Sequence, residues 1–382
     1  MLTAAILLLA ASGVSLPPQQ AAVLKAGDQN KLAKPVTDWI EARMAADTVE
    51  QLKAREKIEA AVVGAKRAAK GKDPLSLVGD WEVVFGEARE FPKSGFKKAK
   101  VESLEGFAVW VPKNYNPAKD PLPLVLLIPD DGVSPEVAIE EVPSPVRDQC
   151  LIVAPDLRGL AMDELKASPR SMLAGLGHAT NTFRVDRNRM FMVGVGAGAG
   201  PAALYAALLP TFFSCLSRVG GEVPAGVPAG NLELRPHQVH GSVEEAITWA
   251  LEQAPRNPYP SAFEYSFTLP WAGRVYWVQA TKFDPEGSIP DGKLATMKVA
   301  VDRAANRITI DGDFVYQVTL YLNDVIVDLD MPVMIVRNGV EYEYRASRSV
   351  GTLLESYYMS GDASAVYPVV VRAIDFPAAP GK

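Results

Sequence analysis

Residues 184–200, RVDRNRMFMVGVGAGAG, decide the fold class of this chain. After a charged start, the stretch continues as an apolar strand at residues 190–195 and ends in a glycine-rich turn, and residues 201–209 then begin a helix. Glycine is needed where φ is positive or where two backbones pass too close for side chains. The pattern therefore predicts a buried strand, a tight turn and a helix in direct succession.

Three interpretations of this turn make different predictions. In a dinucleotide-binding turn, glycines let a pyrophosphate approach the helix N-terminus, and an acidic residue about 20 positions on binds the ribose. In a nucleophile elbow, glycines flank a strained catalytic residue. A third interpretation gives the turn a structural role alone. Nucleotide binding at residues 194–200 is disfavoured, because the turn lies in the middle of the chain and residues 211–216, TFFSCL, supply no strand ending in Asp or Glu.

The segments around the turn predict an α/β fold. Residues 122–128 (LPLVLLI), 150–154 (CLIVA) and 190–195 (MFMVGV) are too rich in aliphatic side chains to have a solvated face. Such strands, separated by helix-length segments at residues 171–183 and 199–209, indicate a mainly parallel sheet with helices on both faces. Two further β-like runs precede them, at residues 81–85 and 107–112.

The order of these segments resembles the α/β-hydrolase superfamily, in particular its esterases and polyhydroxyalkanoate depolymerases. In that family Val-Asp-x-x-Arg precedes the strand, as Val185-Asp186-x-x-Arg189 does here, and Gly-x-Ser-x-Gly follows it. Residues 124–131 resemble the strand that leads to the oxyanion loop, and residues 151–159 (LIVAPDLRG) resemble the next strand and turn. The resemblance covers residues 106–260 and implies a serine hydrolase fold with a Ser, an acid and a His.

Two departures from the family pattern bear on function. The family's nucleophile position is Gly196, between Gly194 and Gly198, and glycine has no side chain that could attack a carbonyl. The oxyanion segment, usually rich in His and Gly, is Pro129-Asp130-Asp131-Gly132, and two carboxylates there would repel a developing oxyanion. We therefore expect no catalytic residues and a degenerate, pseudo-hydrolase site.

The remaining candidates for catalysis are few, since the chain has only 3 His. His240 resembles either the His-Gly that ends one family strand or the catalytic histidine near the last helix, and Ser242 is the serine nearest to it. Asp156 follows a predicted strand and is the candidate acid. His178 lies within a predicted helix and is expected to pack there.

Asp130, Asp131 and Asp156 also form the weak candidate for a cation site, since ligands of open α/β sheets bind at the carboxyl ends of the strands. The alternative is that Asp131-Gly132 and Asp156 cap turns and helix starts, which we favour. We expect no cofactor and no metal.

The 2 Cys can make at most one disulfide. In the family's strand order, two strands lie between those of Cys150 and Cys215, which gives about 14 Å at about 4.8 Å per strand. That exceeds the limit of about 7 Å between the Cα atoms of a disulfide. Two buried thiols are expected.

The rest of the chain divides into further parts. Residues 1–18 contain the apolar run 2–11, too short for a membrane span and typical of a signal peptide, although no Lys or Arg precedes it. Residues 28–76 are expected to form two helices, and residues 77–260 the α/β-hydrolase-like domain. Residues 261–382 alternate apolar and polar positions and predict a mainly antiparallel β-rich domain, with a hairpin turn at Asn338-Gly339 and a short helix at residues 349–359.

Composition limits the partners. With 39 Lys+Arg against 45 Asp+Glu the net charge is -6, which gives no basic surface for nucleic acid. We expect a secreted or periplasmic protein without a membrane span in the mature chain, binding another protein or a polymer at the cell envelope. The alternative is an active carboxylic-ester hydrolase that uses a displaced serine, Ser242.

Overall fold

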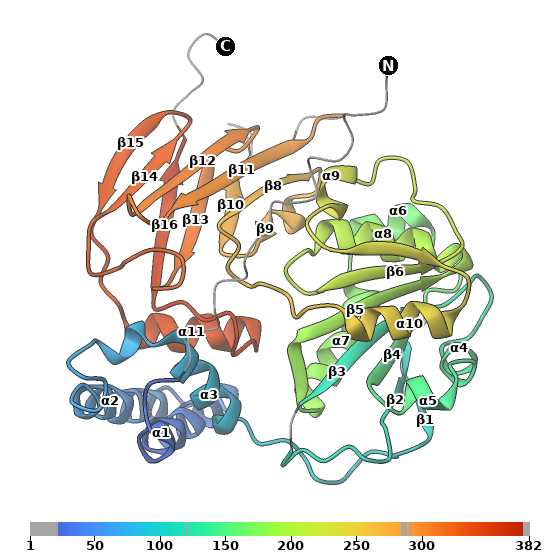
Figure 1. The fold of residues 1–382 in the computed structure, drawn as a ribbon, viewed down its shortest axis with the longest axis horizontal. Coiled ribbons are helices and arrows are strands. Elements are labelled where there is room, and N and C mark those ends of the chain that lie inside the picture. The colour runs from blue at the N-terminus through green and yellow to red at the C-terminus, as the bar shows by residue number, and fades with distance from the viewer. Residues whose placement is uncertain (1–21, 120, 284–288, 290–291, 377–382) are drawn as a thin grey trace, which may run out of the picture.

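The computed structural model describes residues 22–119, 121–283, 289 and 292–376. The expected signal peptide, residues 1–18, lies outside the described residues. Figure 1 shows an α/β part formed by the middle of the chain (the central part), two sheets formed by the C-terminal third, and a group of N-terminal helices that packs beside α11. In the described part of the chain, no helix has both the length and the apolar composition that crossing a membrane requires.

The central sheet has seven strands in the order β1-β2-β4-β3-β5-β6-β7. Its strands are β1 (Val101–Leu104), β2 (Phe107–Trp110), β3 (Leu122–Ile128), β4 (Leu151–Pro155), β5 (Val185–Val195), β6 (Cys215–Val219) and β7 (His237–His240). Strands β4, β3, β5, β6 and β7 run parallel, whereas β1 and β2 are antiparallel to their neighbours. The expected mainly parallel α/β sheet is confirmed.

Helices cover both faces of this sheet because its strands are apolar on both sides. In β3, Val125 and Leu127 face the α4 and α10 side, whereas Leu124 and Leu126 belong to the core on the α7 and α8 side. This alternation is the period of two of a strand with two buried faces. The helices of the central part are α4 (Pro135–Glu140), α5 (Ser144–Arg147), α6 (Met162–Ala167), α7 (Arg170–Thr182), α8 (Ala199–Leu208), α9 (Ala229–Leu232) and α10 (Val243–Glu252).

The two expected N-terminal helices are confirmed as α1 (Ala26–Met44) and α2 (Thr48–Ala65), with Asp47 capping α2 through the amides of Val49 and Glu50. A short turn of 3-10 helix, Pro74–Ser76, follows. The expected strand at residues 81–85 is wrong, because these residues lie in a helix, α3 (Val78–Ala88).

The physical reason for this difference lies in the burial of α3. Trp81, Val84 and Phe85 are buried, whereas Val83 is 38% exposed, so the burial pattern has helical spacing and not the alternation of a strand. The Phe85 ring stacks on Tyr357 of α11 with centroids 4.1 Å apart. This contact with a residue from the other end of the chain stabilises α3 as a helix against the strand propensity of its Trp, Val and Phe side chains.

The C-terminal third forms two mainly antiparallel sheets, as expected. A four-stranded sheet has the order β16-β13-β10-β9 and a five-stranded sheet the order β15-β14-β12-β11-β8, in which β12 and β14 are the parallel pair. Asn338 and Gly339 both have positive φ in the hairpin between β14 and β15, which confirms the predicted turn. The elements are β8 (Ala262–Phe267), a 3-10 turn (Pro270–Ala272), β9 (Arg274–Val275), β10 (Val278–Lys282), β11 (Ala295–Asp302), β12 (Arg307–Asp313), β13 (Gln317–Leu322), β14 (Val333–Arg337), β15 (Val340–Tyr344), α11 (Val350–Ser360) and β16 (Val369–Asp375).

Cys150 and Cys215 are free and buried, as predicted. Cys215 begins β6 and Cys150 immediately precedes β4, and β3 and β5 lie between these strands. Burial raises the pKa of each thiol to about 12, so both stay protonated at neutral pH.

A buried ion pair joins the central part to the loop after α11. The guanidinium of Arg256 donates to the carboxylate of Asp362 and to Ser364 Oγ, the latter at 2.9 Å. Its Nε also donates to the carbonyl of Arg187 at 2.9 Å. The side chain of Arg256 is 5% exposed and that of Asp362 is 12% exposed, so water screens this pair very little.

Candidate functional site

The turn after β5 has the backbone shape of a nucleophile elbow. A 3-10 turn, Gly196–Gly198, leads from β5 directly into α8, and Gly196 has φ +52°. A Cβ at Gly198 would lie less than 3.0 Å from the carbonyl oxygen of Pro129, and one at Gly194 would lie 2.6 Å from the Cβ of Ala202. The glycines are therefore required by positive φ in one case and by close packing in the other two.

The carboxylate of Asp130 occupies the space above Gly196. A Cβ added at Gly196 would lie less than 3.0 Å from Cγ and both carboxylate oxygens of Asp130. Asp130 Oδ1 accepts a hydrogen bond from the backbone N–H of Ala197 at 2.7 Å and another from that of Asp131 at 2.8 Å. A fixed negative charge thus lies where a side chain of the turn would otherwise project.

These two amides are the donors that an elbow of this type uses for an oxyanion hole. Such a hole consists of the N–H of the residue after the nucleophile position and an N–H from the loop after β3. Ala197 follows Gly196, and Asp131 lies in the loop after β3. Donors in an oxyanion hole act at about 2.7–3.1 Å from the oxyanion. Asp130 Oδ1 accepts both hydrogen bonds at such distances.

The space that remains beside the elbow is small. A cavity of about 180 Å³ lies next to Asp130, Asp131, Ala197 and Arg158, with an apolar side formed by residues of β3, α6 and the loop between β4 and α6. Because the negative charge of Asp130 lies at the N-terminal end of α8, the site also disfavours the phosphate of a nucleotide.

His240 and Ser242 lie near each other in sequence, and both contact α10: His240 packs against it and Ser242 caps its N-terminus. The ring of His240 packs against Trp249 with centroids 5.2 Å apart, and its Nε2 is buried without a hydrogen-bond partner among the described residues. Burial lowers the pKa of His240, while Glu245 acts in the opposite direction. Ser242 Oγ accepts from the amide of Glu245 at 3.2 Å and caps α10.

Asp156 lies far from His240. Three strands separate β4, which precedes Asp156, from β7, which ends at His240. Four spacings of about 4.8 Å place the two strand ends about 19 Å apart. Asp156 instead binds the guanidinium of Arg158 at 2.7 and 2.8 Å, and this hydrogen-bonded partner lowers its pKa. The structure therefore does not bring Ser242, His240 and Asp156 together.

His178 is half-buried in α7, with its ring 5.4 Å from that of Phe107 and 6.2 Å from that of Phe183. Within the residues that the structure describes, no group of three or more His, Cys, Asp or Glu side chains is placed to hold a metal ion. Asp130 accepts hydrogen bonds from backbone amides, and Asp156 accepts from the guanidinium of Arg158.

Sequence reasoning missed two parts of this site. The position of Asp130 over Gly196 depends on how β3 and β5 align, and the sequence alone does not supply that register. The role of Arg158 could have been suspected, because an Arg two residues after Asp in the turn LIVAPDLRG can bend back onto the carboxylate.

Comparisons with known proteins give a partial structural likeness. No protein-family model and no curated protein matches the chain. A thermostable esterase is 18% identical, with 38% of this chain and 58% of that chain covered and a TM-score of 0.27. S-formylglutathione hydrolase from Staphylococcus aureus is 16% identical, with 38% and 60% covered and a TM-score of 0.26. Esterase 2 from Thermogutta terrifontis is 14% identical, with 43% and 92% covered and a TM-score of 0.28.

The chain thus spans less than two thirds of the first two of these proteins. The similarity to α/β-hydrolase esterases concerns part of the chain. The strand order of the central sheet and the strand-turn-helix of β5 and α8 define the fold.

Proposed function

We propose that this chain is a pseudo-hydrolase, an α/β-hydrolase-like protein that has no ester-cleaving activity and acts by binding another protein or a polymer at the cell envelope. One observation carries the proposal: Asp130 Oδ1 accepts from both amides that would form an oxyanion hole, directly over Gly196. An esterase needs a nucleophile and free donors for the oxyanion. Gly196 supplies no nucleophile, and Asp130, which lies over it, already accepts from the two donors.

The alternative, an active carboxylic-ester hydrolase, requires Ser242 as a displaced nucleophile. Ser242 would have to give up its cap on α10, and it would need a base and a third group that orients that base. His240 lies close in sequence, but Asp156 is bound to Arg158 across the sheet. The alternative therefore lacks an acid in place.

We expect the purified protein to show no turnover of p-nitrophenyl acetate or butyrate above that of a mock purification, and no labelling by a fluorophosphonate probe. A serine esterase treated in parallel serves as the positive control. Turnover that disappears in His240→Ala, or a fluorophosphonate adduct found by mass spectrometry on the peptide containing Ser242, would establish the alternative.

We further propose that the protein acts outside the cytoplasm, on the strength of the apolar run of residues 2–11 and the small residues that follow it. Expression of the full chain in a bacterium with an outer membrane should yield a shortened protein in the periplasmic fraction. N-terminal sequencing measures this directly, and an intact Met1 on protein confined to the cytosol would refute export.

A further inference from the structure

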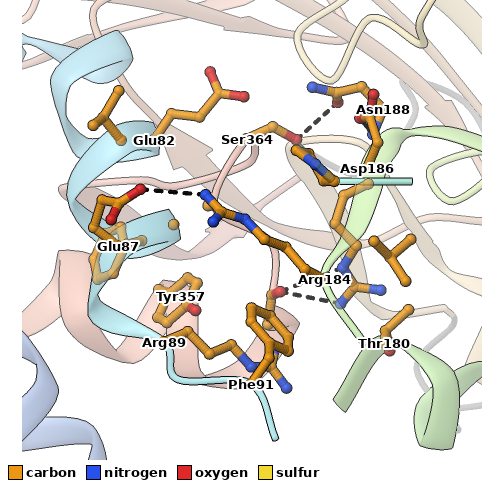
Figure 2. Close-up of a pocket in the computed structure, with 18 of the residues that line it drawn as sticks. Glu82, Glu87, Arg89, Phe91, Thr180, Arg184, Asp186, Asn188, Tyr357 and Ser364 are labelled. Atoms are coloured by element: carbon orange, nitrogen blue, oxygen red, sulfur yellow. Dashed lines mark hydrogen bonds and ion pairs between the residues drawn. The ribbon is translucent and has the colours of Figure 1, made fainter. Parts of the chain in front are cut away.

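A cavity of about 650 Å³ lies where the three parts of the chain meet, between α3, the start of β5 and the segment around α11. Figure 2 shows Glu82 on the wall formed by α3, with Asp186 and Asn188 on the opposite wall. This cavity lies at the start of β5, whereas the elbow lies at its end, and a strand of 11 residues spans about 36 Å. It is therefore a separate feature, present whether or not the elbow is catalytic.

The walls of the cavity are largely apolar and aromatic. Phe85, Phe91, Phe183 and Tyr357 line it. Phe85, Phe183 and Tyr357 are buried, so Phe91 offers the most accessible aromatic surface of the four. Its volume falls within the range of about 300–1,000 Å³ that is common for small-molecule sites, which combine apolar walls with a few polar groups. The charged groups of the cavity determine which charge such a ligand would carry.

The cationic side chains of the cavity already have partners. Arg184 pairs with Glu87 at 3.2 Å, and Arg89 donates to Asn181 Oδ1 at 2.8 Å and lies over the Phe91 ring. Arg187 donates to the carbonyl of Ser360 at 2.9 Å and to that of Gly361 at 3.2 Å. No arginine of the cavity is left without a hydrogen-bond acceptor among the described residues.

Two carboxyl groups of the cavity, those of Glu82 and Asp186, have fewer partners than the arginines. Glu82 has neither a hydrogen bond nor an ion pair in the part of the chain that the structure describes, although it lines the cavity. Asp186 accepts from backbone amides, that of Asn188 at 2.9 Å and that of Arg189, and forms no ion pair among the described residues. An unpaired, half-buried carboxylate is costly unless a cation or a donor approaches it.

The electrostatic surroundings of Glu82 point the same way. Burial, with a smaller contribution from the neighbouring carboxylates of Asp362 and Asp186, raises its pKa to about 7, while Arg256 acts in the opposite direction. The surroundings of Glu82 thus disfavour a second negative charge and favour a positive one placed beside it.

We propose that this cavity binds a small organic cation, an ammonium or guanidinium group on an apolar or aromatic stem, with the positive group beside Glu82 and the stem against the aromatic walls. The cation would supply the donor that Glu82 lacks. This inference goes beyond the proposed function and does not depend on it.

Three probes with one stem test the proposal: 4-phenylbutylamine, the neutral 4-phenylbutan-1-ol and the anionic 4-phenylbutanoate. Isothermal titration of the whole protein at pH 8 is expected to show saturable binding of the amine and about tenfold weaker binding of the alcohol, the size of a lost charge-assisted hydrogen bond. The carboxylate should bind more weakly still. Absence of saturable amine binding up to about 10 mM, or equal affinity for amine and alcohol, would overturn the proposal.

Glu82→Gln is expected to weaken amine binding about tenfold and to leave alcohol binding unchanged, because only the charge is removed. The matched control is Glu90→Gln, two residues beyond the end of α3 and outside the cavity lining, which should bind the amine as the wild type does. Equal loss in both variants, or none in Glu82→Gln, would contradict the assignment of Glu82.

The pH dependence supplies an independent readout. Charged or titratable groups facing Glu82 are Asp186 and Arg187 on β5, Asp362 after α11, and Arg256 and Tyr259 in the segment after α10. Within this group Glu82 has a pKa of about 7, so it gains its negative charge between pH 6 and 8. Amine affinity should therefore rise over this pH range in the wild type and stay constant in Glu82→Gln.

The melting temperature of Glu82→Gln tests whether the variant folds as stably as the wild type. A raised pKa stabilises the folded state below the ordinary Glu value of 4.5, and this contribution is lost as the pH rises through about 7. Glu82→Gln should therefore melt at or above the wild-type temperature at pH 8. A lower melting temperature at that pH would contradict the view of Glu82 as a carboxylate without a partner.

Discussion

Replacement of Asp362 by alanine is expected to lower the free energy of unfolding by about 3–5 kcal/mol, the usual cost of removing one partner from a buried ion pair. The change would leave Arg256, whose side chain is 5% exposed, without a counter-charge. It would also remove the acceptor of the Ser364 amide and hydroxyl, which donate to Asp362 at 3.0 and 2.7 Å. Chemical denaturation at pH 7 measures the difference.

Asp163→Ala is the matched control, because its carboxylate is 95% exposed and pairs with Lys166 only at 3.4 Å. Its effect should stay within about 0.5 kcal/mol. A loss below about 1 kcal/mol in Asp362→Ala would show that the ion pair does not hold the central part to the loop after α11.

The effect of Asp362→Ala should depend on pH. Burial alone would raise the pKa of Asp362, but Arg256 and Arg187 and the Ser364 hydroxyl outweigh it and hold the pKa below its ordinary value of 3.8. A carboxyl with a lowered folded pKa stabilises the protein above the unfolded value and loses this contribution as the pH falls. The difference between wild type and variant should therefore be full at pH 7 and shrink below pH 3.8.

Gly196→Ser, which places a serine at the elbow, is expected to destabilise the protein by about 2–5 kcal/mol and to produce no esterase. A side chain at φ +52° costs about 1–2 kcal/mol, and the overlap of its Cβ with the Asp130 carboxylate adds about 1–3 kcal/mol. No turnover is expected, since Asp156 lies across the sheet from His240 and is bound to Arg158.

Two controls separate the backbone cost of positive φ from the cost of overlap with the Asp130 carboxylate. Gly220→Ser has φ +66° with no atom within 4 Å of the added Cβ, so it should show the backbone cost alone. In an Asp130→Ala background, Gly196→Ser should cost only that same amount, which a double-mutant cycle records as coupling of at least about 1 kcal/mol. Additive effects would mean that Asp130 does not occupy the space above Gly196.

The sequence predicts the central sheet well because its signals are local. Aliphatic runs at β3, β4 and β5 mark strands buried on two faces, and the glycines after β5 mark a turn that other residues cannot make. The assignment fails at α3, where Trp81, Val84 and Phe85 have the composition of a strand and become helical through contact with α11. That contact joins residues at opposite ends of the chain, and no window of sequence contains both.

The candidate site also has features that the sequence predicts and features that only the folded chain shows. The glycine at the turn position, Gly196, can be read directly from the sequence, since a single residue decides it. The hydrogen bond from the Ala197 amide to Asp130 cannot be predicted from the sequence, because the two residues are 67 positions apart and meet only through the pairing of β3 with β5. The cavity at Glu82 is assembled from α3, β5 and the segment around α11, and only the folded chain reveals it.

The contact between the N-terminal helices and α11 also governs when the protein can fold. Arg348, just before α11, pairs with Asp73 at 3.4 Å, and these residues are 275 positions apart in the chain. At a synthesis rate of about 5–20 residues per second, the N-terminal helices leave the ribosome roughly 15–55 s before their partner exists. During that interval Trp39 of α1 and Phe85 of α3 lack the rings of Tyr358 and Tyr357 in α11 that they pack against. We therefore expect the nascent chain to need a chaperone until α11 has been made.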